Sequence, residues 1–304
     1  MLSIELLEKF EKEIAYLNKA TIVTPSKNSF AVNSGLKGEE KVFLILQKHC
    51  EKIYRSVVLW NKKHTFTTEI DFILIINGFL VLVESKEWYG VLDNHIDSSK
   101  INLSQLNLKG QFFKQERTSP VAAVGGFGND LMDFLRNSSP LKKIQLKKII
   151  VFTRDELEIK GDFSSSRAIL CHLNKFEEEI LKIKSEINLN PYLINTLLPS
   201  WDYYYDVKAS CWYKAVITSA SIDTSDGLIN QSEISSILFD DEYLDNALIK
   251  LKSNRVISTK INRHSIQINS ELRFAQNRVR FIKFDDILHS ELTNNPDLEK
   301  INYI

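Results

Sequence analysis

Apolar residues near the start of the chain recur with helical spacing. They fall every three or four positions, at Leu2, Leu6, Phe10, Ile14 and Leu17, which predicts an amphipathic helix over residues 2–18. After a polar loop, a second helix is predicted for residues 38–50. The Ile- and Val-rich run at residues 53–60 predicts a strand.

The clearest local signal is a pair of apolar runs, residues 70–76 and 79–86, joined by Asn77-Gly78. Asn-Gly between two such runs is a strong hairpin cue, because a type I′ turn needs positive φ at both central residues. A two-residue loop pairs Ile76 with Phe79, and counting outward places Asp71 opposite Glu84. Lys86 then shares the face of Glu84. The sequence therefore predicts two carboxylates and a lysine at one end of an apolar hairpin.

The pattern up to residue 206 mixes strands and helices. Residues 93–118 are polar and weakly patterned, and the glycine-rich stretch 125–128 is expected to be a flexible turn before a helix capped near Asn129. The remaining predictions are strands over 144–153 and 167–173, a helix over 175–187 capped by Asn174, and a short helix over 191–198. The aromatic cluster 201–206 marks the expected end of a first domain, residues 1–206.

The spacing of apolar residues changes in the last third of the chain. Helices are predicted over 210–220, 229–239 and 241–253, followed by two short alternating runs at 261–266 and 268–272. Three helices and a small hairpin are typical of a winged-helix domain. We therefore expect a winged-helix-like domain over residues 207–304.

The opposed carboxylates need a compensating partner. Like charges placed across a hairpin are destabilising, and burying them costs more. Mg²⁺ would compensate, because it prefers one or two carboxylates together with water and substrate phosphate oxygens. The lysine could then position the attacking water and offset charge in the transition state. The alternative is that Asp71, Glu84 and Lys86 are surface charges at the solvent-facing end of the hairpin.

Glu39 adds to the predicted cluster. On the helix from residue 38 it shares a face with Val42, Phe43 and Leu46, which form the apolar stripe. A glutamate on an inward stripe is unusual without a partner. Its neighbour Glu40 falls on another face and is expected to be solvated.

These residues resemble the nuclease-related domain (NERD) family, a branch of the PD-(D/E)xK restriction-endonuclease-like superfamily. The resemblance runs from about Gly35 to Phe152 and rests on three segments in order: Gly35-Leu-Lys-Gly-Glu39, Thr68-Glu-Ile-Asp71 and Val83-Glu-Ser-Lys-Glu-Trp-Tyr-Gly90. It implies an α/β (α+β) fold, with a mixed central sheet flanked by helices and a core over about 35–153. It also implies a DNA nuclease dependent on Mg²⁺ or Mn²⁺, with Asp71, Glu84 and Glu39 on the metal and Lys86 as a further catalytic residue.

One position departs from the family pattern. The family usually carries Pro-x-x-Gln ahead of a helix, whereas this chain has Pro120-Val-Ala-Ala123. Gln111 and Gln115 are the candidates to replace the missing glutamine.

Charge averaged over the whole chain hides a local asymmetry. Lys and Arg number 39 and Asp and Glu 39, a net charge of zero that by itself speaks against nucleic-acid binding. Residues 251–283, however, hold eight basic side chains and one acidic one. The candidates for nucleic-acid contact there are Lys252, Arg255, Lys260, Arg263, Arg273, Arg278 and Arg280, on the predicted recognition helix and wing. The alternative is a protein-docking or dimerising domain whose charges are solvated.

Composition limits the cellular setting. Hydrophobic residues make up 43% and charged residues 26%, as in globular proteins. Three cysteines without a Cys-x-x-Cys pair indicate a reducing compartment. The N-terminus does not have the pattern of a signal peptide, and the most apolar stretch, residues 70–83, is too short to span a bilayer. We expect a cytoplasmic protein without membrane contact.

The function predicted from the sequence is a metal-dependent DNA endonuclease that hydrolyses phosphodiester bonds. A role in defence against foreign DNA follows from the family resemblance alone. Two alternatives stay open. One is a non-catalytic DNA-binding or regulatory protein on a nuclease scaffold. The other is an interaction module that recruits a helicase or another defence subunit, or forms a homodimer, through its C-terminal domain.

Overall fold

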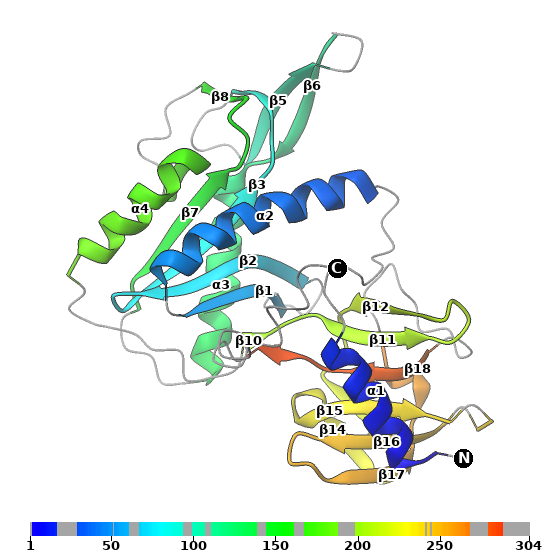
Figure 1. The fold of residues 1–304 in the computed structure, drawn as a ribbon. Helices are drawn as coiled ribbons and strands as arrows, with labels where there is room; N and C mark the ends of the chain where they lie inside the picture. The colour runs from blue at the N-terminus through cyan, green and yellow to red at the C-terminus, as the bar shows by residue number, and fades with distance from the viewer. Residues whose placement is uncertain are drawn as a thin grey trace. The chain divides into compact units, whose positions relative to one another are not determined.

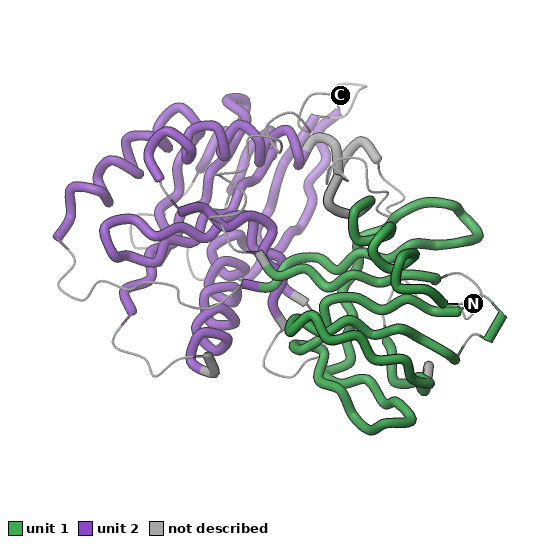
Figure 2. Tube along the Cα trace, turned by 60° about the horizontal axis from the view of Figure 1, so that its bottom comes forward, with its two compact units in different colours: residues 1–25, 199–304 green, residues 26–198 purple. Residues whose placement is uncertain are grey.

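The computed structural model describes residues 2–16, 29–50, 52–60, 67–93, 99–106, 111–138, 144–160, 167–187, 198–240, 242–243, 245–267 and 279–287. The chain forms two compact units, shown in Figure 2. We call residues 26–198 the central unit, and residues 1–25 with 199–304 the β-rich unit.

A mixed five-stranded sheet organises the central unit. Its strands lie in the order β1-β2-β3-β7-β9, with bounds β1 (Ile53–Trp60), β2 (Thr67–Ile76), β3 (Phe79–Lys86), β7 (Leu146–Phe152) and β9 (Ile169–His172). The first three strands are antiparallel, whereas β3, β7 and β9 run parallel. The predicted mixed sheet and its strands at 53–60, 70–76, 79–86, 144–153 and 167–173 are confirmed within a few residues.

Helices cover both faces of this sheet (Figure 1). Helices α2 (Ser29–His49) and α4 (Leu173–Ser185) pack on one face through residues such as Val42, Leu46 and Ile180. Helix α3 (Pro120–Ser138) packs on the other face through Leu131 and Leu135. Because β3 is covered on both sides, it is apolar at nearly every position up to Glu84.

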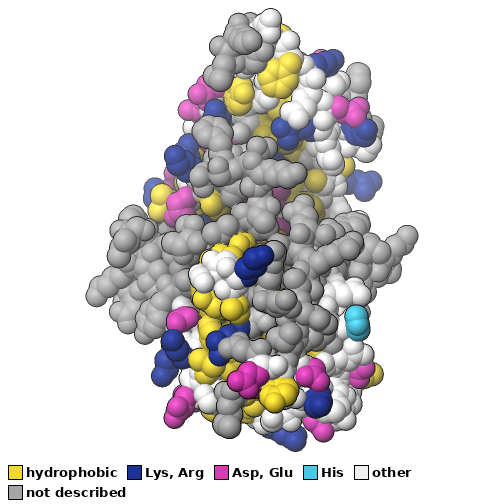
Figure 3. All heavy atoms as spheres, turned by 90° about the vertical axis from the view of Figure 1, so that its right-hand side faces the viewer, with side chains coloured by type: hydrophobic (Ala, Val, Ile, Leu, Met, Phe, Trp, Pro, Cys, Tyr) yellow, Lys and Arg dark blue, Asp and Glu magenta, His cyan; other side chains and the backbone are white. Residues whose placement is uncertain are grey.

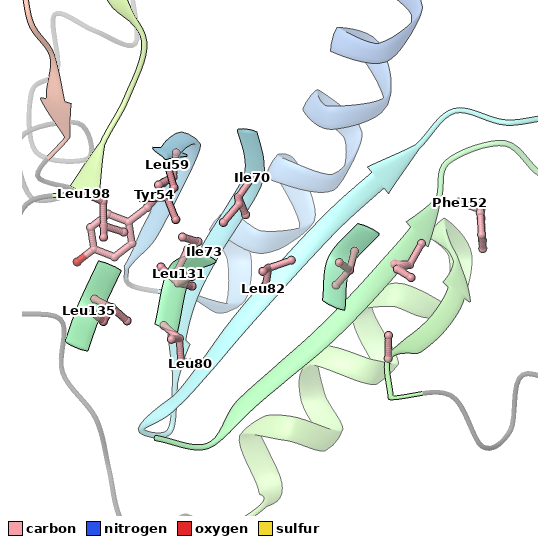
Figure 4. Packing of buried hydrophobic residues seen from close by; sticks show 14 of the residues in the cluster. Tyr54, Leu59, Ile70, Ile73, Leu80, Leu82, Leu131, Leu135, Phe152 and Leu198 are labelled. Carbon is pink, nitrogen blue, oxygen red and sulfur yellow. The ribbon is translucent and has the colours of Figure 1, made fainter. Parts of the chain in front are cut away.

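The core on the α3 side is drawn in Figure 4. Side chains of β1, β2, β3, β7 and α3 interlock there, among them Tyr54, Ile73, Leu82, Leu131 and Phe152. Each aliphatic side chain fully buried in this way contributes about 1.5–3 kcal/mol. This packing fixes the middle of the hairpin, so the charged residues at its end have a rigid support.

A second, four-stranded sheet follows where the sequence shows only weak patterning. Its order is β6-β5-β4-β8, with β4 (Gly90–Asp93), β5 (Lys100–Leu106), β6 (Phe112–Thr118) and β8 (Leu157–Lys160). Ile101 and Leu103 of β5 are buried in the core on the α3 side. Buried positions alternate with partly exposed polar ones at residues 101–104 of β5, but polar Gln105 at the next buried position breaks the apolar pattern in the sequence.

Two local predictions in the central unit are wrong. The glycine-rich stretch 125–128 is not a turn but lies inside α3, which starts at Pro120, where a fixed φ favours the first turn of a helix. Helix α4 begins earlier than expected, with His172 rather than Asn174 as its N-terminal cap residue. The helix predicted over 191–198 falls outside the described residues, apart from Leu198.

The β-rich unit is built on a six-stranded antiparallel sheet in the order β12-β11-β18-β15-β16-β17. The strands are β11 (Asp202–Asp206), β12 (Cys211–Ala215), β15 (Ile234–Phe239), β16 (Asn246–Leu251), β17 (Val256–Lys260) and β18 (Val279–Lys283). Two small two-stranded ladders accompany it: β10 (Leu198–Pro199) with β19 (Asp286–Ile287), and β13 (Ser221–Thr224) with β14 (Gly227–Asn230).

The winged-helix prediction is therefore wrong. The segments predicted as helices at 210–220, 229–239 and 241–253 contain β12, β14, β15 and β16 instead. Short apolar runs such as Ile234–Phe239 fit either a buried helix or a buried strand. Here β15 pairs on both sides, with β16 and β18, so nearly all its side chains are buried and the period-two alternation is lost.

The first helix, α1 (Ile4–Tyr16), is confirmed but belongs to the β-rich unit. Phe10 stacks on Phe281 of β18 at 5.2 Å between ring centroids and meets the edge of Trp212 at 5.7 Å. Tyr203 and Tyr205 of β11 join the same cluster. The run 201–206 thus starts the β-rich unit instead of ending the first domain, and the expected boundary at residue 206 moves to 198/199.

Candidate active site at the end of the β2–β3 hairpin

The hairpin register is the one predicted. Ile76 pairs with Phe79, and the ladder continues to Phe72 opposite Val83. Asn77 and Gly78 both have positive φ, 47° and 76°, as a type I′ turn requires. One step beyond Phe72 and Val83, Asp71 and Glu84 come together at the open end of the hairpin.

Glu84 is the most deeply buried of the predicted site residues, with 4% of its surface exposed. Its Oε1 accepts a hydrogen bond from Lys86 Nζ, while Oε2 is buried and has no hydrogen-bond partner among the described residues. Burial, reinforced by repulsion from Asp71, raises the pKa of Glu84 to about 8. Oε2 of Glu84 is therefore available to bind a cation.

Asp71 is held in place by Ser85. The Asp71 Oδ2 atom accepts hydrogen bonds from the Ser85 backbone nitrogen at 2.7 Å and from Ser85 Oγ at 3.0 Å. Burial raises the pKa of Asp71, and the charge of Lys86 and the bonds from Ser85 offset only part of that effect. Ser85 was not predicted as a site residue. Its position between Glu84 and Lys86 was the one feature of the sequence that could have indicated it.

Lys86 is the cationic member of the cluster, with a quarter of its side chain exposed. Burial alone would lower the pKa of Lys86, but attraction by Glu84 and Asp71 raises the pKa above its usual value. Lys86 therefore stays protonated between the two carboxylates.

Glu39 of α2 acts on the same lysine, since its charge also raises the pKa of Lys86. Val42 and Leu46 on the same helical face are buried, which confirms the predicted apolar stripe. Glu40 is exposed and forms an ion pair with Arg55 at 3.2 Å. Glu39 and Glu40 thus lie on different faces of α2, as the helical spacing predicted.

Two further polar residues lie beside the cluster and were missed. In the parallel ladder Lys86 pairs with Phe152, so Glu87 follows next to Thr153. Glu87 Oε2 and Thr153 Oγ1 are buried without a partner among the described residues, and Glu87 Oε1 accepts a hydrogen bond from Arg154 Nε at 3.3 Å. Both unpaired atoms face Gly38. No spacing rule linked these residues, because they meet only through β3–β7 pairing.

The candidates for the missing glutamine lie on the surface. Gln115 is exposed on β6 and accepts a hydrogen bond from Arg117 at 2.8 Å, and Gln111 is exposed just before this strand. Ala123 sits early in α3. The buried glutamine of this region is Gln105, whose Nε2 donates to the Tyr89 carbonyl at 3.1 Å.

The basic residues predicted to contact nucleic acid do not form the expected helix and wing. Lys252 pairs with Asp286, Lys260 lies 3.8 Å from Asp245, and Arg280 lies over the Phe10 ring at 5.8 Å. Arg255 is exposed in the turn before β17. Arg273, Arg278 and the Arg263 side chain fall outside the described residues. With strands in place of a recognition helix, the geometric reason for assigning these residues to DNA contact is lost.

The donor set suits a hard divalent cation. Among the described residues no three His, Cys, Asp or Glu side chains gather in an arrangement that could hold a metal. Mg²⁺ does not need such a cage, because it takes one or two carboxylates and fills its other positions with water and phosphate oxygens. Glu84 Oε2, which has no partner in the described part of the chain, and the facing Asp71 match this requirement.

Comparison with known proteins found one family model that matches part of the central unit. No match was found among curated proteins or among solved structures. In the described part of the chain no helix is long and apolar enough to cross a membrane. Residues 34–153, which include all four predicted catalytic residues, match the family model of the nuclease-related domain, NERD.

Proposed function

We propose that this protein is a metal-dependent DNA endonuclease that hydrolyses phosphodiester bonds. The observation that carries the proposal is the buried Oε2 of Glu84, which has no hydrogen-bond partner among the described residues. It lies opposite a second carboxylate, Asp71, in a segment similar to nuclease-related domains. Leaving a buried oxygen without a hydrogen-bond partner costs about 1–3 kcal/mol. A bound cation removes that cost.

In this proposal Asp71 and Glu84 hold Mg²⁺ or Mn²⁺, and Glu39 supports the ion directly or through water. When bound, such an ion polarises the phosphoryl oxygen and lowers the pKa of coordinated water. The two bonds from Ser85 fix the Asp71 carboxylate in one orientation, so the ligand geometry needs little reorganisation when DNA arrives.

Lys86 is the residue proposed to act on the reacting atoms. Its ammonium group, kept protonated by the carboxylates, positions the attacking water and offsets the negative charge that grows on the phosphate oxygens. The water oxygen bonds to phosphorus and releases a proton to solvent, the ester P–O bond breaks, and the departing oxygen takes up a proton from solvent.

Cleavage of supercoiled plasmid tests the proposal. Wild-type protein should nick or linearise the plasmid with Mg²⁺ or Mn²⁺ and not in EDTA. Lys86→Ala and Asp71→Ala should each abolish cleavage while keeping the circular-dichroism spectrum of the wild type. Retained activity in either variant would refute the assigned roles.

Binding measurements separate the enzyme from a non-catalytic scaffold. If wild-type protein binds the metal and DNA but does not nick the plasmid, the result would favour the alternative, a regulatory DNA-binding protein. A defence role would be tested by phage plaque counts on cells that express wild-type or Lys86→Ala protein, and equal counts would contradict it.

A further inference from the structure

Arg154 follows the end of β7, beside the segment that leads away from Lys86. The Thr153 backbone nitrogen donates to the Lys86 carbonyl at 3.1 Å, and the Gly90 nitrogen donates to the Glu156 carbonyl at 3.2 Å. The short loop that carries Arg154 is therefore held at both ends. Since β3 and β7 are parallel neighbours, Arg154 and Lys86 lie at the same edge of the sheet. Ligands of open α/β sheets bind at this edge, outside the carboxyl ends of the strands.

The guanidinium of Arg154 is oriented by two residues of that neighbouring segment. Its Nε donates to Glu87 Oε1 at 3.3 Å, and its central carbon lies 5.3 Å from the centre of the Tyr89 ring. The Glu87 side chain is only 11% exposed, whereas a third of the Arg154 side chain reaches solvent. One edge of the guanidinium thus rests on the protein while the group stays accessible.

The ion pair with Glu87 does not use the whole guanidinium. Arginine frequently pairs with a carboxylate through two parallel N–H···O bonds. Here a single bond forms, from Nε, and Glu87 Oε2 is buried without a partner among the described residues. Within the same residues Nη1 and Nη2 form no hydrogen bond, and the exposed Asp155 and Glu156 form no ion pair with Arg154. The outer edge of the guanidinium is therefore available to a ligand with two acceptor oxygens.

Positive and negative side chains are mixed on the surface. Lys and Arg equal Asp and Glu in number over the chain, and Figure 3 shows described basic and acidic side chains interspersed on one face. A face of this kind attracts a polyanion weakly, so contact with a phosphate backbone depends on cations placed one by one. Arg154 is such a cation, at the edge that carries Lys86. It pairs with Glu87 and not with Glu84, so it would meet a different phosphate from the one beside Lys86.

We propose that Arg154 binds a phosphodiester group of the nucleic acid next to the one that is cleaved. The planar guanidinium matches two phosphate oxygens at once, which a lysine ammonium does not. Glu87 and Tyr89 are positioning residues, because they set the plane of the guanidinium before the substrate arrives. A contact of this kind fixes the register of the backbone relative to Lys86. The inference rests on the proposed nuclease function and adds a second phosphate site to it.

The test measures binding apart from cleavage, with the full chain in EDTA. Fluorescence anisotropy gives Kd for a short labelled DNA duplex and for its single strand over a range of salt concentrations. The variants are Arg154→Gln, Arg154→Lys, and Arg154→Gln combined with Glu87→Gln. The matched control is Arg136→Gln, because Arg136 is an exposed arginine that also pairs with one carboxylate, Asp133 at 3.4 Å.

Arg154→Gln should bind nucleic acid at least about tenfold more weakly, the usual effect of losing hydrogen bonds to a charged group. Its slope of log K against log salt should become shallower by about 0.9 for the duplex or about 0.7 for the single strand, since one phosphate contact is lost. Arg154→Lys keeps the charge and should keep the slope, but it should lose affinity because the ammonium does not form the fork. The substrate that shows the loss identifies the form of nucleic acid that reaches Arg154.

The double variant separates phosphate binding from a purely structural role. If Arg154 only balances the charge of Glu87, removal of both charges should restore wild-type binding. If Arg154 binds phosphate, the double variant should remain weaker than wild type. Circular dichroism checks the fold of each variant, and if Arg154→Gln alone does not fold, the double variant and Arg154→Lys supply the comparison.

Four results would overturn the phosphate site: wild-type binding by Arg154→Gln, wild-type binding by the double variant, an equal loss in Arg136→Gln, or no nucleic-acid binding by wild type. If wild type cleaves plasmid and Arg154→Gln binds and cleaves equally well, the proposed nuclease stands and only this site fails. If Arg154→Gln weakens binding but wild type cleaves nothing, the phosphate site stands without the nuclease.

Discussion

Gly38 of α2 lies directly against Thr153 at the end of β7. A Cβ on Gly38 would stand 2.9 Å from Thr153 Oγ1 and 3.3 Å from Glu87 Oε2. The helix thus approaches the sheet at the residue before Glu39, and this approach sets where Glu39 stands relative to Lys86.

Gly38→Ala should lower the free energy of unfolding by about 1–3 kcal/mol, the usual cost of overpacking. It should also reduce cleavage by displacing Glu39. Gly35→Ala is the matched control in the same helix, since a Cβ there meets nothing within 4 Å. That variant should gain up to about 1 kcal/mol from helix propensity. Urea unfolding of both proteins measures the difference, and equal shifts would contradict the close approach.

Glu84→Gln should abolish metal binding without changing the stability of the metal-free protein. Since the pKa of Glu84 is already raised to about 8, the amide replaces a largely neutral acid, and the metal-free variant should be about as stable as wild type. Mg²⁺ at 100 times Kd should stabilise wild type by about 2.7 kcal/mol and the variant by nothing. Thermal unfolding with and without Mg²⁺ measures this.

Glu69→Gln is the control for that experiment, on an exposed glutamate two residues from Asp71. It should keep the metal-dependent rise in Tm. A rise in Tm for Glu84→Gln equal to that of wild type would remove Glu84 from the metal site.

The neighbouring glutamates of α2 form a second matched pair. Glu39→Gln should reduce cleavage about 10–100-fold, the usual effect of losing a group that supports a metal shell. Glu40→Gln loses only an exposed ion pair with Arg55 and should stay within about twofold of wild type. Initial rates of plasmid cleavage measure both, and equal rates for the two variants would exclude a role for Glu39.

Asp202 should make the β-rich unit less stable as pH rises. Burial raises the pKa of this carboxyl to about 8, although it accepts a hydrogen bond from the Ile217 backbone nitrogen at 3.0 Å. Between the unfolded pKa, about 3.9, and about 8, the folded state binds more protons than the unfolded state. This group's contribution to the free energy of unfolding therefore falls with pH, by up to about 1.4 kcal/mol per unit.

Asp202→Asn removes that dependence and leaves an acceptor for Ile217. The stability of the variant relative to wild type should grow from pH 5 to pH 8 in urea unfolding. A difference that stays constant over this range would contradict the raised pKa.

The sequence by itself determined the hairpin and its charged end. Asn77-Gly78 sets a two-residue turn, the turn sets the register, and the register brings Asp71, Glu84 and Lys86 together. These steps need only local backbone geometry, so they can be derived without a structure. The helical spacing that separates Glu39 from Glu40 is local in the same sense.

Only the tertiary structure decided the rest. The described residues of the last third of the chain lie mostly in strands, because their apolar runs pair with distant partners, such as β15 with β18, and propensity does not encode such partners. Helix α1 joins that sheet through Phe10 and Phe281, more than 250 positions apart in the chain. Glu87, Thr153 and Gly38 likewise meet only where three elements converge. The physical reason is common to all three cases: the burial that stabilises these contacts depends on surfaces supplied by remote parts of the chain.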